Sequence, residues 1–149
     1  MSGRIVVGVD GSEGARSALE WALGEARLRG ASLRAVQAWH LPPLVSGVGV
    51  FDPPATLDAD TLERVESGAT QLLEQELAAV DTSGVEIERI VEPRNPADAL
   101  LEAARDADLL VVGTRGHGGF TGLLLGSVSQ QVSHHAPCPV VIVPPRETS

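Results

Sequence analysis

Apolar residues are arranged along this chain in two alternating kinds of segment. Short, nearly continuous apolar runs such as RIVVGV (residues 4–9) and DLLVVG (108–113) are typical of strands that are buried on both faces. Between such runs, apolar residues recur every three or four positions, as they do on one face of a helix. Strands that alternate with helices in this way predict a parallel sheet covered by helices on both faces.

The boundaries of these segments give the order of the elements. The apolar runs predict five strands, at residues 4–9, 32–39, 85–91, 108–113 and 139–144, and the helical spacing predicts four helices, at residues 12–30, about 57–80, 95–107 and about 126–135. Ser12 and Asn95 are good N-caps for two of the helices, and Pro96 suits a first helical turn. The strand at 85–91 alternates in polarity, which predicts a place near a sheet edge. We expect one α/β domain over residues 1–149, a three-layer sandwich around a five-stranded parallel sheet.

The second predicted strand is followed by a segment of another composition. From His40 to about Thr56 the chain reads HLPPLVSGVGVFDPPAT, which is rich in proline and glycine. This composition predicts a long loop, and loops of such length inside a compact domain are usually functional or mobile.

Six glycines lie between Gly113 and Gly126, directly after a predicted strand and before a predicted helix. Ligands of open parallel sheets bind beyond the carboxyl ends of the strands, where the strand order reverses. Glycine lets a backbone approach a ligand closely, and the free N–H groups of a helix start favour an anion. The stretch is therefore a candidate phosphate cradle, although a merely flexible turn would also explain glycines.

The charge of the chain and the spacing of its glycines exclude several kinds of phosphate-binding site. The net charge is −9 and all eleven basic residues are arginine, so a nucleic-acid surface is not expected. Without lysine the GxxxxGK[ST] phosphate loop is excluded, and the GxGxxG dinucleotide pattern fails because Thr121 occupies its third glycine position.

No apolar run is long enough to cross a bilayer, and the N-terminus does not read as a secretion signal. A lone cysteine, Cys138, fits a reducing compartment, so we expect a cytoplasmic protein.

A third glycine pattern does fit. Gly113, Gly116 and Gly126-Ser127 follow the spacing G-x2-G-x9-G-[S/T]. This spacing resembles that of the ATP-binding branch of the universal stress protein family. The segments VVGVDGS, DLLVVGTRGHGG and GSVSQQVSHHAPCPVVIVP extend the resemblance over essentially the whole chain. It implies an adenine-nucleotide α-hydrolase-like fold with strand order 3-2-1-4-5, and a site for ATP together with Mg²⁺ or Mn²⁺.

The resemblance also implies roles for particular residues. Asp10 matches the family's acid near the ribose and the metal-phosphate region, and Gly8 and Val9 beside it would wall the nucleotide. Ala38 matches the position whose backbone meets the adenine edge. The remaining positions match the loop that wraps ribose and phosphates, Gly113, Arg115, Gly116, His117 and Gly118, and the helix start that holds the phosphates, Gly126, Ser127, Val128 and Ser129.

Several of these residues have a second interpretation. Asp10 could be a turn or capping residue, because Asp is common before helices. Arg115 could be a solvated loop cation, and His117 could contribute its backbone or its side chain. His134 and His135 are adjacent, so on a helix they point in different directions, and capping of the helix end is the preferred interpretation. Cys138 is expected to be a packed thiol rather than a nucleophile.

The last predicted strand has a further consequence. Its residues Val140, Val141, Ile142 and Val143 are wholly apolar, and the predicted topology puts them at a sheet edge. Such an edge invites pairing with another chain, and the resemblance implies a homodimer formed through this strand. The alternative is that the loop at 40–56 covers the edge.

Three hypotheses for the function follow. The first is an ATP-binding regulator or sensor of the stress response with at most slow hydrolysis, because few groups suited to phosphoryl transfer are placed near the predicted phosphates. The second is a dimeric interaction protein that does not depend on nucleotide. The third is an enzyme that uses an adenine nucleotide to activate a substrate, for which 149 residues leave little room.

Overall fold

A five-stranded parallel sheet forms the centre of the computed structural model, which describes residues 3–39, 44–46, 49–51, 59–114 and 125–145. Its strands lie in the order β5-β2-β1-β6-β7. This is the predicted order 3-2-1-4-5 once the strands of the sheet are numbered along the chain, with β5 at one edge and β7 at the other. The strand bounds are β1 (Arg4–Gly8), β2 (Ser32–Ala38), β5 (Ile87–Glu92), β6 (Leu109–Gly113) and β7 (Val140–Val143).

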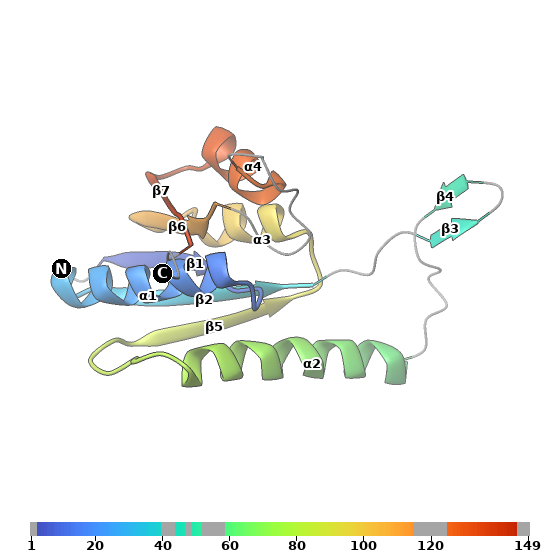
Figure 1. The fold of residues 1–149 in the computed structure, drawn as a ribbon, viewed down its shortest axis with the longest axis horizontal. Coiled ribbons are helices and arrows are strands. Elements are labelled where there is room, and N and C mark those ends of the chain that lie inside the picture. Colours follow the sequence, from blue (N-terminus) through green and yellow to red (C-terminus); the bar gives the residue numbers. More distant parts are fainter. Residues whose placement is uncertain (1–2, 40–43, 47–48, 52–58, 115–124, 146–149) are drawn as a thin grey trace.

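Four helices cover the two faces of this sheet (Figure 1), namely α1 (Glu13–Arg29), α2 (Ala59–Ala78), α3 (Pro96–Ala103) and α4 (Ser127–His135). Alternate residues of each strand face opposite sides, as the pleat requires. Ile5 and Val7 of β1 pack in the cluster with α1 and α2, whereas Val6 packs in the cluster with α3 and α4. The predicted three-layer sandwich is confirmed.

The predicted helix ends are confirmed at the level of individual hydrogen bonds. The Ser12 hydroxyl accepts a hydrogen bond from the Ala15 N–H at 3.1 Å, and the Asn95 side chain accepts one from the Ala97 N–H at 2.9 Å. Gly30 ends α1 in the left-handed region, with φ of 65°, where glycine carries no steric penalty. These local signals fix where α1 and α3 begin relative to the sheet.

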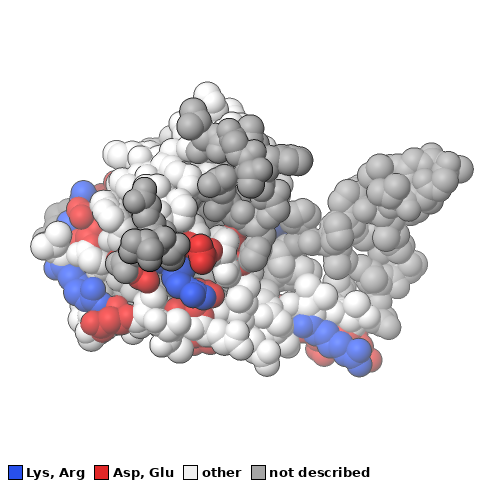
Figure 2. Space-filling view, in the orientation of Figure 1, with Lys and Arg blue, Asp and Glu red and all other residues white. Residues whose placement is uncertain are grey.

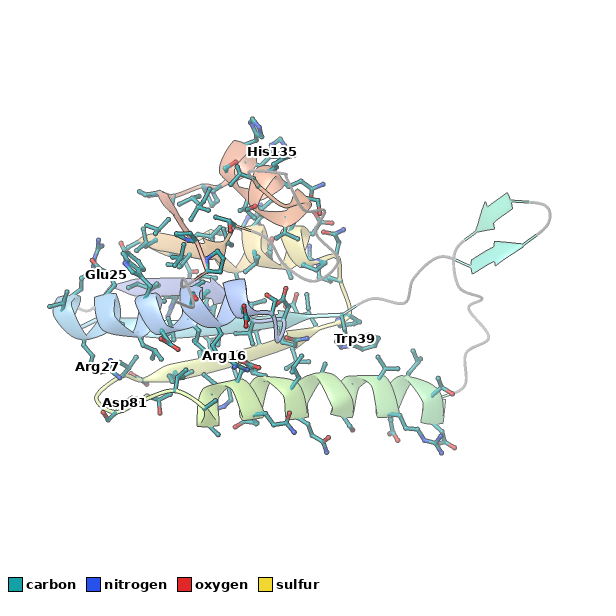
Figure 3. All side chains as sticks on the ribbon, in the orientation of Figure 1. Arg16, Glu25, Arg27, Trp39, Asp81 and His135 are labelled. Atoms are coloured by element: carbon teal, nitrogen blue, oxygen red, sulfur yellow. The ribbon has the colours of Figure 1, made fainter. Side chains whose placement is uncertain are left out.

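Helices α1 and α2 are joined by a bidentate ion pair. The Arg16 guanidinium donates to both carboxylate oxygens of Glu76, at 3.0 and 2.9 Å. Glu76 is only 5% exposed, so its charge is matched inside the layer rather than left to solvent. The same hydrogen bonds raise the pKa of Arg16 above its ordinary value. Figure 3 shows Arg16 between the two helices.

The apolar stripe of α2 is buried over only part of its length. Ala69, Leu73 and Leu77 are buried, but Leu62 is 39% exposed. The helix starts at Ala59 and runs past the end of the sheet (Figure 1). Its first turns therefore lie beyond the strands that bury the later turns, which the helical spacing alone could not indicate.

The segment predicted as one long loop contains two short strands. β3 (Leu44–Ser46) and β4 (Gly49–Phe51) pair antiparallel and form a second, two-stranded sheet. The prediction of a continuous loop over 40–56 is therefore wrong at these residues. Two short apolar runs on either side of a two-residue connection are the usual arrangement of a β-hairpin.

Two glycines of the main sheet are required by packing. A Cβ on Gly113 would lie 2.7 Å from both the carbonyl carbon and the oxygen of Gly14, which belong to the backbone of α1. A Cβ on Gly8 would lie 3.3 Å from a methyl group of Leu100. The first clash is with rigid backbone and the second with a side chain that can shift. The close approach of α1 to the end of β6 therefore depends on Gly113.

We predict that Gly113→Ala lowers the free energy of unfolding by about 1–3 kcal/mol, because the added methyl group overpacks the α1–β6 contact. Gly8→Ala should cost less, since Leu100 can adjust. Denaturant unfolding followed by circular dichroism measures both. Gly68→Ala in α2 is the control. Apart from its chain neighbours and the backbone of α2 itself, no atom of the described residues lies within 4 Å of its Cβ position, so it should stabilise the helix. A Gly113→Ala protein as stable as the parent would show that α1 does not approach β6 this closely.

Candidate functional site

The carboxyl ends of β1 and β6 meet at one edge of the sheet. The two strands pair in parallel with Val7 opposite Val111, and they end shortly after this pair, at Gly8 and Gly113. The contact between Gly113 and the backbone of Gly14 brings the start of α1 to the same place. The end of β1, the end of β6 and the start of α1 therefore lie together where the strand order predicts a ligand crevice.

Asp10 forms a local turn at this crevice. Its Oδ1 accepts a hydrogen bond from the Ser12 N–H at 2.8 Å, and Gly11 between them has a φ of 83°. Ser12 in turn caps α1. The capping interpretation of Asp10 is thus correct for one carboxylate oxygen. No hydrogen bond to its second oxygen is found among the described residues, so a ligand role is compatible with the turn.

The carbonyl oxygen of Thr114 joins the two ends of the glycine-rich stretch. It accepts hydrogen bonds from the Gly126 N–H at 2.6 Å and from the Ser129 hydroxyl at 2.9 Å. The same hydroxyl lies 3.1 Å from the Gly126 carbonyl oxygen, which its single proton can reach in alternation. Ser129 is 2% exposed. Its hydroxyl is therefore hydrogen-bonded within the chain.

This junction, which we call the Thr114 clasp (Thr114, Gly126 and Ser129), fixes the start of α4. Gly126 is the N-cap and supplies no side-chain hydrogen bond to the first turn. Ser127 is exposed, while Val128 packs against the cluster with α3. The first N–H groups of α4 and the positive end of its dipole thus lie at the carboxyl end of β6.

The other residues implied by the family resemblance are placed as follows. Val9 is 5% exposed and packs in the core, and its N–H extends the ladder to the Val36 carbonyl at 2.8 Å. Ala38 ends β2 half-buried. The side chain of Val9 is therefore part of the core, and Gly8 contributes only backbone at the end of β1. Arg115, Gly116, His117 and Gly118 lie outside the described residues.

Three buried polar atoms at the ends of β2 and β5 were not predicted from the sequence. Gln37 Oε1, Trp39 Nε1 and Glu92 Oε2 have no hydrogen-bond partner in the described part of the chain, although Glu92 lies 3.6 Å from Arg94. Figure 3 shows Trp39 at the end of β2. The polar Gln37 within the apolar run AVQAW was the one signal available. For Thr114 the sequence held no signal.

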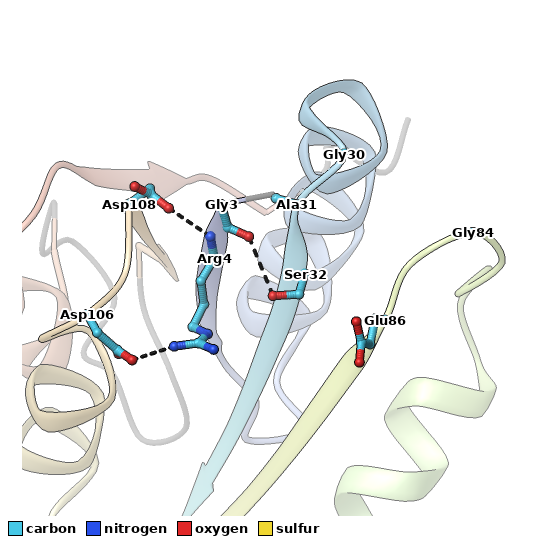
Figure 4. Close-up of a pocket in the computed structure, with 9 residues that line it drawn as sticks. All are labelled: Gly3, Arg4, Gly30, Ala31, Ser32, Gly84, Glu86, Asp106 and Asp108. Atoms are coloured by element: carbon cyan, nitrogen blue, oxygen red, sulfur yellow. Dashed lines mark hydrogen bonds and ion pairs between the residues drawn. The ribbon is translucent and has the colours of Figure 1, made fainter. Parts of the chain in front are cut away.

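A hollow of about 500 Å³ lies at the other end of the strands, around the amino ends of β1 and β2 (Figure 4). Of the three carboxylates that line it, those of Asp106 and Asp108 are engaged within the chain. Asp108 accepts from the Arg4 N–H at 2.8 Å, and Asp106 is bound by the side chains of Arg4 and Arg34. The hydrogen bond from Arg34 lowers the pKa of Asp106. These contacts hold strand ends together, so we place the candidate site at the crevice instead.

The surface and the remaining titratable groups offer few alternatives. Figure 2 shows acidic and basic side chains side by side, without a basic stripe on the face in view. Burial raises the pKa of the Cys138 thiol, which packs beside the α3–α4 cluster, as expected for a packed thiol. His134 and His135 are exposed in the last turn of α4, with ring centroids 6.4 Å apart.

Metal sites and membrane spans can be assessed in the part of the chain that the structure describes. Within it, no three His, Cys, Asp or Glu side chains gather closely enough to hold a metal ion on their own. In the same residues no helix has the length and apolar character needed to cross a membrane.

Comparison with solved structures supports the fold. A universal stress protein in complex with cAMP superposes with a TM-score of 0.61 at 28% identity, covering 97% of this chain and 98% of the other. A universal stress protein from Archaeoglobus fulgidus in complex with dAMP gives a TM-score of 0.55, also at 28% identity, covering 94% and 96%. Two structural neighbours of this chain thus bind adenine nucleotides.

Sequence comparison gives the family. A universal stress protein of Mycolicibacterium smegmatis is 40% identical over 144 residues, which is 95% of this chain and 46% of the relative. The chain thus spans about half the length of the curated relatives it matches. The family model for universal stress proteins matches residues 1–144. Together with the five-stranded parallel sheet, this match shows that the chain belongs to the universal stress protein family.

Proposed function

We propose that this chain binds ATP, with Mg²⁺ or Mn²⁺, in the crevice between β1 and β6, and that bound nucleotide regulates its part in the stress response. The observation that carries the proposal is the Thr114 clasp. It brings the two ends of the glycine-rich stretch together and sets the start of α4, which has no side-chain cap, at the carboxyl end of β6. Backbone N–H groups in that position suit a phosphate chain.

The charge of the protein makes backbone donors important. At a net charge of −9, the overall field opposes an anionic ligand, so attraction has to come from local groups. Those groups are the N–H groups of Ser127 and Val128, since the Gly126 N–H is already donated to the Thr114 carbonyl, together with Arg115 in the stretch outside the described residues. Asp10 fits a divalent cation, because the turn uses only one of its oxygens and Mg²⁺ commonly takes one or two carboxylates alongside phosphate and water.

We propose a regulator rather than a fast enzyme. Rapid phosphoryl transfer needs a positioned base and cations against the developing charge. Asp10 is the carboxylate that the described residues bring to the crevice, and one of its oxygens holds the α1 turn. Slow hydrolysis remains compatible with this arrangement. We further propose that residues 1–149 form one domain that acts in the cytoplasm, where its lone Cys138 stays reduced.

We also propose a homodimer formed through β7, which is the basis of the alternative function as a nucleotide-independent interaction protein. The Leu110 N–H bonds the Pro139 carbonyl and the Thr114 N–H bonds the Val143 carbonyl. In a parallel ladder the alternate residues, here Val140 and Ile142, then direct their N–H and C=O groups to the open side. Such an unpaired apolar edge favours pairing with a second copy.

The variant Asp10→Asn distinguishes the role of Asp10 in the turn before α1 from its proposed role in ligand binding. The Asn side chain keeps an oxygen for the Ser12 N–H but loses the charge, so the fold should be retained. We predict that affinity for Mg-ATP, measured by calorimetry, falls by about tenfold or more because a charge-assisted contact is lost.

The control for this experiment is Asp81→Asn. Asp81 makes the same kind of turn with the Ser83 N–H, at 3.1 Å, in the loop after α2 and away from the crevice. Binding by this variant should equal that of the parent. If Asp10→Asn also binds Mg-ATP as the parent does, Asp10 is a capping residue only.

The β7 edge is tested by Ile142→Pro, which removes one outward N–H while leaving the ladder to β6 in place. We expect this change to convert a dimer to a monomer in sedimentation velocity, with the helical circular dichroism retained. Val140→Pro removes the neighbouring outward N–H and serves as an independent variant. A folded variant that stays dimeric would place the dimer contact elsewhere.

A further inference from the structure

In the described part of the chain, the buried side-chain atoms that lack a hydrogen-bond partner all lie at the same end of the sheet. They are Gln37 Oε1 and Trp39 Nε1, at and just after the end of β2, and Glu92 Oε2 at the end of β5. Among the same residues, none lies at the amino ends of the strands. Buried polar atoms are normally paired, so their concentration at the end where parallel sheets bind ligands points to groups that take their partner from a ligand.

Gln37 is the most enclosed of the three residues. It is 6% exposed and lies two residues after Ala35, on the face of β2 that packs against α1 and α2. Its register partner on β5 is Val91, which packs in the same apolar cluster. An amide in such surroundings costs free energy while its oxygen is unpaired, and a bound group that donates to this oxygen removes the cost.

Trp39 offers the opposite kind of group. Its N–H bonds the Glu92 carbonyl at 2.9 Å, so the ladder between β2 and β5 extends to this residue (Figure 3). Trp39 therefore lies on the same face of β2 as Gln37, two residues earlier. The indole N–H can only donate. The two side chains thus present one acceptor and one donor, both buried and both unpaired among the described residues.

Glu92 does not belong to this pair. It is the register partner of Ala38, which packs on the opposite face of the sheet with α3 and α4. Its carboxylate also has a cation near it, since Arg94 lies 3.6 Å away. The acceptor and the donor that need a ligand on the α1–α2 face are therefore those of Gln37 and Trp39.

The pair lies where the far end of the proposed nucleotide would reach. β2 is next to β1, and the Val9 N–H bonds the Val36 carbonyl at 2.8 Å, so the end of β2 borders the Asp10 turn. The proposed phosphate donors lie at the end of β6, on the other side of β1. Two strand spacings separate β6 from β2, which is about 10 Å. A nucleotide that holds its phosphates at α4 and extends past Asp10 therefore brings its base to the end of β2.

We propose that Gln37 and Trp39 read the base of the bound nucleotide, an inference that rests on the nucleotide binding proposed above. The Gln37 oxygen accepts from the 6-amino group of adenine, and the Trp39 indole N–H donates to the adjacent ring nitrogen N1. The 6-amino group is a donor and N1 is an acceptor, so each side chain meets the atom that its own chemistry requires. These two residues are then determinants of base specificity.

Calorimetric titration with two nucleotides tests the role of Gln37. Purine riboside triphosphate keeps N1 but lacks the 6-amino group. The parent should bind Mg-ATP about three- to tenfold more tightly than the magnesium complex of this analogue, because the analogue leaves Gln37 unpaired. Gln37→Met keeps an unbranched side chain without the amide. It should lose the same factor for ATP and none for the analogue, so that it no longer distinguishes the two.

Trp39→Phe should give a different result. It keeps an aromatic ring but loses the N–H, and both ATP and the purine analogue carry N1. Affinity for the two should therefore fall by a similar factor, about three- to tenfold, with the preference for ATP retained. The analogue 1-deaza-ATP lacks N1, so the parent and Trp39→Phe should bind it equally.

Two variants with the same substitutions serve as controls. Gln75→Met changes an exposed residue of α2, and Trp21→Phe changes a residue of α1 that is 38% exposed. Both should bind every nucleotide as the parent does. Without nucleotide, Gln37→Met should be at least as stable as the parent to denaturant, because it removes a buried oxygen that has no partner. A marked loss of stability would show that the fold itself uses the amide, and would overturn the proposal.

The outcomes separate this inference from the function on which it rests. If the parent binds Mg-ATP and Gln37→Met keeps the parent's preference for ATP over the purine analogue, the base is read elsewhere and Gln37 meets an ordered water only. The nucleotide site would then stand without this pair. Weaker binding of 1-deaza-ATP by Trp39→Phe than by the parent would likewise remove Trp39 from base reading. A parent that binds no nucleotide would overturn both proposals.

Discussion

A single carbonyl oxygen, that of Thr114, determines where the glycine-rich stretch of this protein begins and ends. It accepts the Gly126 N–H and the Ser129 hydroxyl, so a stretch with little backbone preference of its own is closed by bonds at its two ends. Because Thr114 follows β6 directly and Ser129 belongs to the first turn of α4, these bonds also fix the helix to the sheet. The ligand site we propose exists only where that connection holds.

The glycines of the site serve more than one purpose. Gly113 belongs to the family motif, yet its missing side chain is used to admit the backbone of Gly14. The approach of α1 to β6 brings the Asp10 turn to the crevice, so packing and ligand geometry depend on the same residue. Gly24 differs, since among the described residues beyond its own helix nothing lies within 4 Å of its Cβ position. Packing inside the fold thus requires a glycine at position 113 but not at position 24.

Much of the fold followed from local patterns, because strands buried on both faces, helical spacing and capping residues act within a few positions. For this reason α1 begins after Ser12 and ends at Gly30, and α3 begins after Asn95, as expected. The overhang of α2 could not be predicted, since it depends on the length of the strands beside it. The role of Ser129 was also beyond sequence reasoning. Its partner, Thr114, is fifteen residues away, and the bond exists only once β6 and α4 are side by side.

The central claim is that the Thr114 clasp prepares a site for nucleotide, and Mg-ATP titration of two serine variants tests it most directly. Ser129 and Ser133 both lie on α4 and both donate to a carbonyl three residues earlier, but Ser133 is exposed and away from the clasp. The account predicts about tenfold weaker binding for Ser129→Ala and parental binding for Ser133→Ala. Equal binding by both variants, or no binding by the parent protein, would contradict it.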